Sequence, residues 1–123
     1  MAENVEKIVI IGTHGAEDPE RASMPFVVAN AALAMDVQVN VVLQGYSVTL
    51  AQKGVNEHVF AGGFPPLKEL MDSFFAQGGK ILVCTPCIKE RKIEQGMLLE
   101  GATAIAAGRV VQECLEAKAT LNY

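Results

Sequence analysis

The stretch Ile81-Leu82-Val83-Cys84-Thr85-Pro86-Cys87 decides how this chain folds. Its first three residues form a continuous apolar run, which is typical of a parallel strand covered on both faces. The run leads directly into Cys84 and a Cys-Thr-Pro-Cys turn. We therefore expect a buried parallel strand that ends at Cys84, with the turn at the edge of the sheet.

Two similar runs lie upstream of this stretch. Residues Lys7–Gly12 and Gln38–Leu43 are rich in β-branched residues and predict two more covered strands. Between them, Asp18-Pro19 predicts a helix start, because Asp is a good N-cap and Pro suits the first helical position. We expect this helix to run to about Asp36.

The rest of the chain continues the alternation of strands and helices. Ser47 predicts the cap of a short helix over 48–53, and apolar residues at helical spacing predict a helix over 67–75. Downstream of the two close cysteines we expect a polar segment over 88–95, a fourth strand over 103–105, a helix over about 107–118 and a short edge strand over 120–123.

Strands that alternate with helices predict right-handed crossovers and a parallel sheet. The expected architecture is a single α/β domain over residues 1–123, a three-layer α/β/α sandwich with a mostly parallel five-stranded sheet. Sites in such sheets form outside the carboxyl ends of the strands. The loops after Gly12 and Leu43 and the turn at Cys84 should therefore meet on one rim, where we expect the functional site.

Composition excludes several classes of protein. Half of the 123 residues are hydrophobic and a fifth are charged, which excludes a disordered chain. The net charge of -4 disfavours nucleic-acid binding, and no apolar stretch approaches the roughly 20 residues of a membrane span. The opening Met1-Ala2-Glu3-Asn4 lacks the basic residues of a secretory signal, so we expect a cytoplasmic protein.

Cys84 is the leading candidate for chemistry. A thiolate is a far better nucleophile than a thiol, and a strand-to-helix turn directs N–H groups and a helix dipole at the sulfur. Lys89 and Arg91, which follow closely, could add positive potential near Cys84. We therefore expect a reactive, easily ionised Cys84. Cys87 is either a resolving thiol or a residue that packs under the turn.

Metal binding and a structural disulfide framework are both disfavoured. A single Cys-x-x-Cys lacks the second ligand pair of a tetrahedral zinc site, so we expect no metal. Three cysteines in a reducing compartment do not form a disulfide framework. Cys114 lies on a predicted apolar helix stripe with Val110, Val111 and Leu115, and we expect it in the core.

Two residues of the other rim loops are candidates for substrate binding. His14 lies in Gly12-Thr13-His14-Gly15, and Tyr46 follows the second strand. The glycines there match neither a dinucleotide fingerprint nor a P-loop. His14 either assists proton transfer, lines the pocket, or is an exposed or hydrogen-bonded loop residue. His58 is expected on the surface.

Taken in order and spacing, several short motifs resemble the DsrE/DsrF-like family, which includes sulfur-relay proteins and members labelled predicted peroxiredoxins. The likeness covers nearly the full length. It rests on Ile-Ile-Gly-Thr-His-Gly at 10–15, Asp-Pro-Glu-Arg at 18–21, Leu-Gln-Gly at 43–45, Lys-Gly-Val at 53–55, Pro-Pro-Leu-Lys-Glu-Leu at 65–70 and Val-Cys-Thr-Pro-Cys at 83–87.

The resemblance implies a homo-oligomer, either a trimer or a hexamer. It also implies that a cysteine after an apolar strand, here Cys84, accepts sulfane sulfur as a persulfide and passes it on. The partners would be sulfur-donor and sulfur-acceptor carrier proteins, and no cofactor is implied. Cys87 departs from those relay members that have one reactive cysteine at this site.

Three functions follow as hypotheses. The first is a cytoplasmic sulfurtransferase or sulfur carrier with its persulfide on Cys84, and with His14, Tyr46, Lys89 and Arg91 around the sulfur. The second is a thiol–disulfide switch or reductase that uses Cys84 and Cys87. The third is a non-catalytic oligomeric module whose rim binds a small ligand and whose cysteines are incidental.

Overall fold

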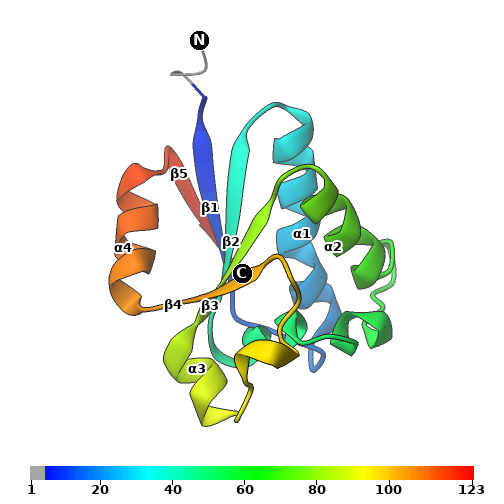
Figure 1. Ribbon diagram of the computed structural model, residues 1–123. Helices are drawn as coiled ribbons and strands as arrows, with labels where there is room; N and C mark the ends of the chain where they lie inside the picture. The colour runs from blue at the N-terminus through cyan, green and yellow to red at the C-terminus, as the bar shows by residue number, and fades with distance from the viewer. Residues whose placement is uncertain (1–4) are drawn as a thin grey trace.

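The structure is a computed structural model that describes residues 5–123. Its centre is a five-stranded sheet in the order β4-β3-β2-β1-β5, and every neighbouring pair is parallel (Figure 1). The strands are β1 (Lys7–Gly12), β2 (Gln38–Leu43), β3 (Lys80–Cys84), β4 (Ala102–Ile105) and β5 (Ala119–Asn122). The predicted α/β sandwich with a parallel five-stranded sheet is confirmed.

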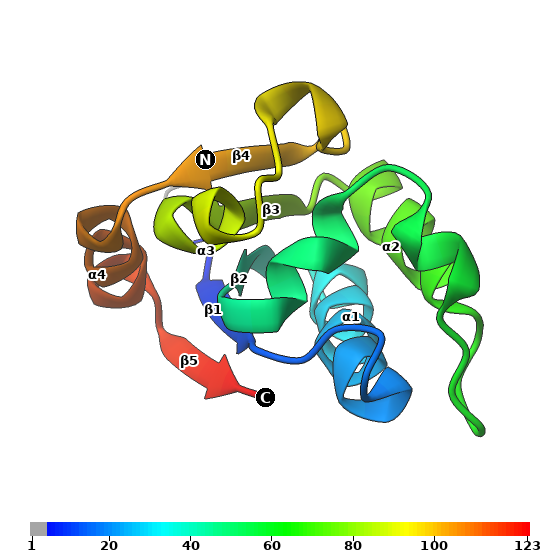
Figure 2. The ribbon, with the colours of Figure 1, turned by 90° about the horizontal axis from the view of Figure 1, so that it is seen from below.

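Helices cover the two faces of the sheet unequally. The helices α1 (Pro19–Ala34) and α2 (Leu67–Ala76) lie on one side, and α4 (Ala107–Glu116) lies on the other (Figure 2). The main core fills the first interface, where the rings of Phe26 and Phe74 meet edge to face with centroids 5.5 Å apart. A smaller apolar cluster of Val9, Val42, Leu82 and Ile105 lies on the second face.

Short helical turns connect these elements around the rim. The 3-10 helices are η1 (Gly45–Ala51), η2 (Val55–His58) and η3 (Gln95–Met97), and the short α-helix α3 is Thr85–Glu90. The helix predicted over 48–53 is therefore a 3-10 helix that begins earlier. Ser47 does not cap it, because its hydroxyl donates to the carbonyls of Gly12 and Gln44 and so ties η1 to the end of β1.

Of the predicted apolar stripe of the last helix, only Val110 packs against a core cluster. Val111 and Leu115 are 58% and 81% exposed, and Cys114 is only half-buried. The buried residue of α4 is Glu113, which is 2% exposed. The prediction of a core Cys114 is wrong, because the side of α4 that faces the sheet carries the buried Glu113, with its charge network, and the partly buried Val110.

That network is built around the Glu113 carboxylate. One oxygen, Oε1, lies 2.6 Å from the amide of Asn40 and 2.8 Å from Nζ of Lys7, and the other accepts from Arg109 at 2.8 Å. Burial alone would raise the pKa of Glu113, but the bonds from Lys7, Asn40 and Arg109 outweigh it and lower the pKa to about 2. A charged Glu113 therefore joins α4 to strands β1 and β2.

Candidate functional site

The carboxyl ends of the strands and the turns that follow them form the rim where the sequence places its candidates. All strands run in the same direction, so Gly12, Leu43 and Cys84 end β1, β2 and β3 at the same edge of the sheet. Figure 2 looks onto this edge, with η1 beside α3. The predicted convergence of these three loops is confirmed.

Cys84 and Cys87 lie together at the centre of this rim. Cys84 is the last residue of β3 and the N-cap of α3, and Cys87 follows one helical turn later. The Thr85 hydroxyl donates to the Ile105 carbonyl at 2.7 Å and so fixes the start of α3 against the end of β4. Both thiols are free and half-buried, and a hydrogen bond joins their sulfur atoms at 2.9 Å.

A backbone amide from the neighbouring turn reaches the second sulfur. The Gly45 N–H donates to the Cys87 Sγ at 3.2 Å, so the turn after β2 contacts the turn after β3. Gly45 has a φ of 59°, in the left-handed region that favours glycine. The sequence did not single out Gly45 as a site residue, although it lies in the Leu-Gln-Gly motif; a backbone donor leaves no side-chain signal.

Arg91 and Tyr46 form a second contact between the same two turns. The Arg91 guanidinium donates to the Cys87 carbonyl at 3.1 Å, and its Cζ lies 5.8 Å from the centre of the Tyr46 ring. Tyr46 is 45% exposed, so this cation–π pair lies at the open surface of the rim. The structure thus brings two of the predicted binding residues next to the thiol pair.

The ionisation of Cys84 differs from the expectation drawn from sequence. Burial raises the pKa of Cys84, and the neighbouring Cys87 sulfur raises it further through its hydrogen bond and its charge. The Cys87 N–H and the Arg91 charge act in the opposite direction but do not compensate. The predicted easily ionised Cys84 is wrong in direction, because the sulfur is partly desolvated and lies against the Cys87 sulfur.

The remaining predicted residues lie farther out on the rim. The His14 ring is 31% exposed, and its Nδ1 lies 2.8 Å from the Glu17 carboxylate, an interaction that the sequence did not predict. The other Glu17 oxygen accepts from the Gly15 N–H, so the loop is closed on itself. Lys89 lies exposed in the last turn of α3. His58 is exposed, as predicted.

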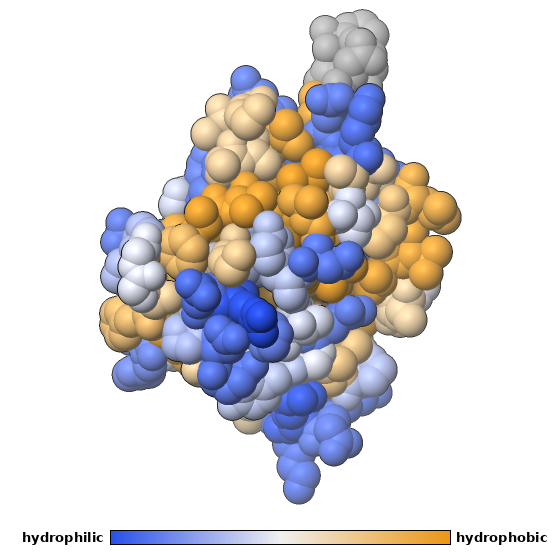
Figure 3. All heavy atoms as spheres, turned by 180° about the vertical axis from the view of Figure 1, so that it is seen from behind, coloured by the Kyte–Doolittle hydropathy of each residue, from blue (hydrophilic) through white to orange (hydrophobic). Residues whose placement is uncertain are grey.

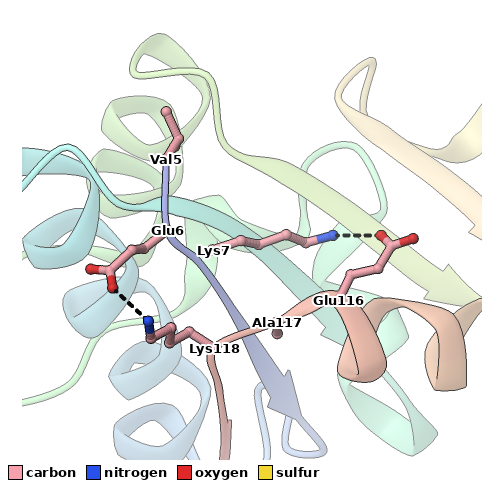
Figure 4. Close-up of a pocket in the computed structure, with 6 residues that line it drawn as sticks. All are labelled: Val5, Glu6, Lys7, Glu116, Ala117 and Lys118. Atoms are coloured by element: carbon pink, nitrogen blue, oxygen red, sulfur yellow. Dashed lines mark hydrogen bonds and ion pairs between the residues drawn. The ribbon is translucent and has the colours of Figure 1, made fainter. Parts of the chain in front are cut away.

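A hollow with a volume of about 560 Å³ lies at the other end of the sheet (Figure 4). It is lined by residues around the starts of β1 and β5, among them Glu6, Lys7, Glu116 and Lys118. Its charged groups pair with one another: Lys118 with Glu6 at 3.3 Å, and Lys7 with Glu116 at 3.5 Å. Because these charges are already paired with one another, the hollow is a weaker candidate for the functional site than the rim that carries Cys84 and Cys87.

Fold and rim together define a small α/β protein that presents a thiol pair at the carboxyl ends of a parallel sheet. The sequence profile of the DsrE/DsrF-like family matches residues 6–123. The chain belongs to the DsrE/DsrF-like family. Over residues 5–123, no helix is long and apolar enough to cross a membrane, and no group of three or more His, Cys, Asp or Glu side chains is placed to hold a metal.

Two curated proteins of Methanocaldococcus jannaschii are similar in sequence. The uncharacterized protein MJ0760 is 31% identical over 103 residues, which cover 80% of this chain but only 38% of that protein. The uncharacterized protein MJ0989 is 31% identical over 96 residues, covering 78% of this chain and 81% of that protein. Neither name states an activity.

Solved structures show the same fold. The YchN protein of E. coli superposes with a TM-score of 0.82 at 20% identity, over 97% of this chain and 100% of its own. The protein MTH1491 of Methanobacterium thermoautotrophicum gives a TM-score of 0.77 at 16% identity, over 96% of this chain and 99% of its own. At these identities the likeness supports the fold alone.

Proposed function

We propose that this protein is a sulfur carrier that holds sulfane sulfur as a persulfide on Cys84 and passes it to the thiol of a partner protein. The observation that carries the proposal is the thiol pair on the rim, with sulfurs 2.9 Å apart and both half-buried. Membership of a family with sulfur-relay members supports the same chemistry. We expect the protein to act in the reducing cytoplasm, where both thiols stay free.

Persulfide transfer asks for few groups, and candidates for each lie on the rim. The carrier needs a nucleophilic sulfur, a positive charge near the negative outer sulfur, and an open approach for a second thiol. Arg91 is the cation that contacts the cysteine turn, and Lys89 adds a second exposed charge on α3. Tyr46 holds the Arg91 guanidinium in place, and His14 lies on the neighbouring loop.

The partners would be sulfur-donor and sulfur-acceptor proteins that dock over this rim. We also propose that the protein forms a homo-oligomer. The exposed apolar side chains of α4 support self-association, and apolar surface extends over the α4 side and the middle of the molecule when it is viewed from behind (Figure 3).

Sulfur loading tests the proposal. The protein is incubated with inorganic polysulfide, and the excess reagent is removed. The mass of the intact protein is then measured by mass spectrometry. We expect wild type and the Cys114→Ser control to gain the mass of one sulfur atom, and Cys84→Ser to remain unmodified. An adduct that persists in Cys84→Ser would exclude Cys84 as the carrier.

A thiol–disulfide switch or reductase is the second candidate, because the two sulfurs are already in contact. It predicts that mild oxidation removes two hydrogen masses from wild type and that no sulfur adduct survives. Cys87→Ser separates the two candidates, since it abolishes a disulfide cycle but leaves the proposed carrier sulfur in place. Full sulfur transfer by Cys87→Ser at any pH would remove the case for the disulfide cycle.

A further inference from the structure

A sulfur carrier needs only one cysteine, but this protein places a second thiol, Cys87, against Cys84. Cys84 is poorly ionised in its partly buried position, yet it is the proposed nucleophile. A protonated thiol attacks sulfane sulfur slowly, because the thiolate is the reactive form. A proton acceptor close to the Cys84 Sγ would therefore speed the attack.

Cys87 is the group in contact with that sulfur. Its Sγ lies 2.9 Å from the Cys84 Sγ and receives the Gly45 N–H at 3.2 Å. A hydrogen bond from a fixed amide stabilises a thiolate more than a thiol. The charged group near the pair is the Arg91 guanidinium from α3, which donates to the Cys87 carbonyl, and the uncharged Tyr46 ring from η1 lies beside that guanidinium.

The hydrogen bond between the sulfurs gives the proton a path. In the fully protonated pair, the Cys87 thiol donates to the Cys84 sulfur. Loss of the Cys87 proton reverses this bond, so that the Cys84 S–H points at a thiolate held by Gly45. A charge on Cys87 raises the pKa of Cys84, which favours a proton on Cys84 until it attacks.

We propose that Cys87 is the general base of sulfur loading, with the Gly45 amide as the group that holds its thiolate. As Cys84 attacks, its sulfur bonds to the outer sulfur of a persulfide donor, and its proton passes to Cys87. The sulfur–sulfur bond of the donor breaks, and the bonding electron pair leaves with the donor thiolate. The products are Cys84 persulfide, protonated Cys87 and the donor thiolate, so atoms and charge balance without any oxidant or reductant.

This assignment rests on the proposed function and changes the role of Cys87. A resolving thiol would attack the loaded Cys84 and expel sulfide as a disulfide forms. A base that has just received the Cys84 proton is a neutral thiol and is a poor nucleophile for that attack. The loaded persulfide would thus remain available for an acceptor protein.

The test is the rate of loading as a function of pH. Cysteine persulfide is the donor, and the sulfur adduct at Cys84 is followed by rapid quenching, alkylation and peptide mass spectrometry. We expect Cys87→Ser to load about tenfold or more slowly than wild type near neutral pH. The deficit should close at alkaline pH, where Cys84 ionises without a base. Cys87→Asp, which restores an anionic acceptor, should recover part of the neutral rate.

Two further readouts separate the possible failures. Once loaded, Cys87→Ser should keep its persulfide no longer than wild type; a much longer lifetime would assign Cys87 as a resolving thiol and overturn the base. Equal loading rates for wild type and Cys87→Ser across the pH range would also overturn it, while leaving the carrier function intact. Absence of any adduct at Cys84 in every variant would instead refute the proposed function, and circular dichroism confirms that each variant is folded.

Discussion

Two residues that are shielded from solvent, Glu113 and Cys84, differ in how their surroundings affect their ionisation. Glu113 is a buried charge that is fully paired, and Cys84 is a partly buried thiol whose ionisation is opposed. The charged Glu113 stabilises the fold. Cys84 must lose its proton to react, and in our proposal the neighbouring Cys87 sulfur accepts that proton. Both follow from the same balance between desolvation and local hydrogen bonds.

Glu113→Gln should lower the free energy of unfolding at pH 7 by about 3 kcal/mol, since it leaves Lys7 without its buried partner. The matched control is Glu116→Gln, because Glu116 contacts the same Lys7 from an exposed position, and we expect a change of about 0.5 kcal/mol or less. Urea denaturation measures both. Equal effects of the two substitutions would contradict a central role for Glu113.

The pH dependence of the same residue follows from its lowered pKa. Because the folded pKa, about 2, lies below the ordinary value of 4.5, the contribution of Glu113 is complete above pH 4.5 and is lost as the pH falls toward 2. The stability difference between wild type and Glu113→Gln should therefore shrink between pH 4.5 and 2. A difference that stays constant over this range would show that the charge of Glu113 is not the cause.

At the scale of elements, the rim depends on close packing between its loops. A Cβ on Gly15 would lie 2.8 Å from the Thr49 hydroxyl and 3.0 Å from the Tyr46 ring and carbonyl. The loop after β1 is therefore pressed against η1, and η1 in turn carries both Gly45 and Tyr46 next to the cysteine turn. A change in one loop should reach the sulfur pair through this contact.

Gly15→Ala should destabilise the protein by about 1–3 kcal/mol, because the added methyl group displaces Tyr46 or Thr49. Gly62→Ala is the control, since a Cβ there meets no atom within 4 Å. Thermal unfolding followed by circular dichroism compares the two variants. A Gly15→Ala protein as stable as Gly62→Ala would contradict the tight packing of the rim loops.

The sequence was sufficient to predict the strands and the meeting of the three loops, because continuous apolar runs mark covered parallel strands. The sequence predicted the helix α4 but not which of its faces is buried. The spacing of Val111 and Leu115 is typical of a helix face that packs in the core, and the same spacing also occurs on an exposed apolar face. The burial of Glu113 depends on Lys7 and Asn40, which lie far away in the chain. Such pairings are fixed only when the sheet is assembled.

Only part of the candidate site could be predicted, because some of its contacts also join residues that lie far apart in the chain. The positions of Cys84 and Cys87 followed from a local motif, that of Arg91 from its nearness to them in the chain, and that of Tyr46 from the topology of the rim. The raised pKa of Cys84 and the Gly45 contact to Cys87 could not be predicted, because desolvation and a backbone donor from another loop leave no trace in residue types.

At the scale of the whole molecule, α4 presents an apolar surface that a monomer would leave in water. We expect wild type to sediment as an oligomer at micromolar concentration. Leu115→Lys should dissociate it and change the stability of the isolated chain by only about 0.5 kcal/mol, because Leu115 is 81% exposed. The oligomer interface lies elsewhere if Leu115→Lys sediments like wild type.

Peptide mapping of the loaded wild-type protein tests most directly whether Cys84 carries the sulfur. After brief treatment with cysteine persulfide, free thiols are alkylated, the chain is digested, and the peptides that contain Cys84, Cys87 and Cys114 are sequenced by mass spectrometry. We expect the additional sulfur atom on Cys84, with Cys87 and Cys114 alkylated as ordinary thiols. An additional sulfur on Cys87 with an unmodified Cys84 would contradict it.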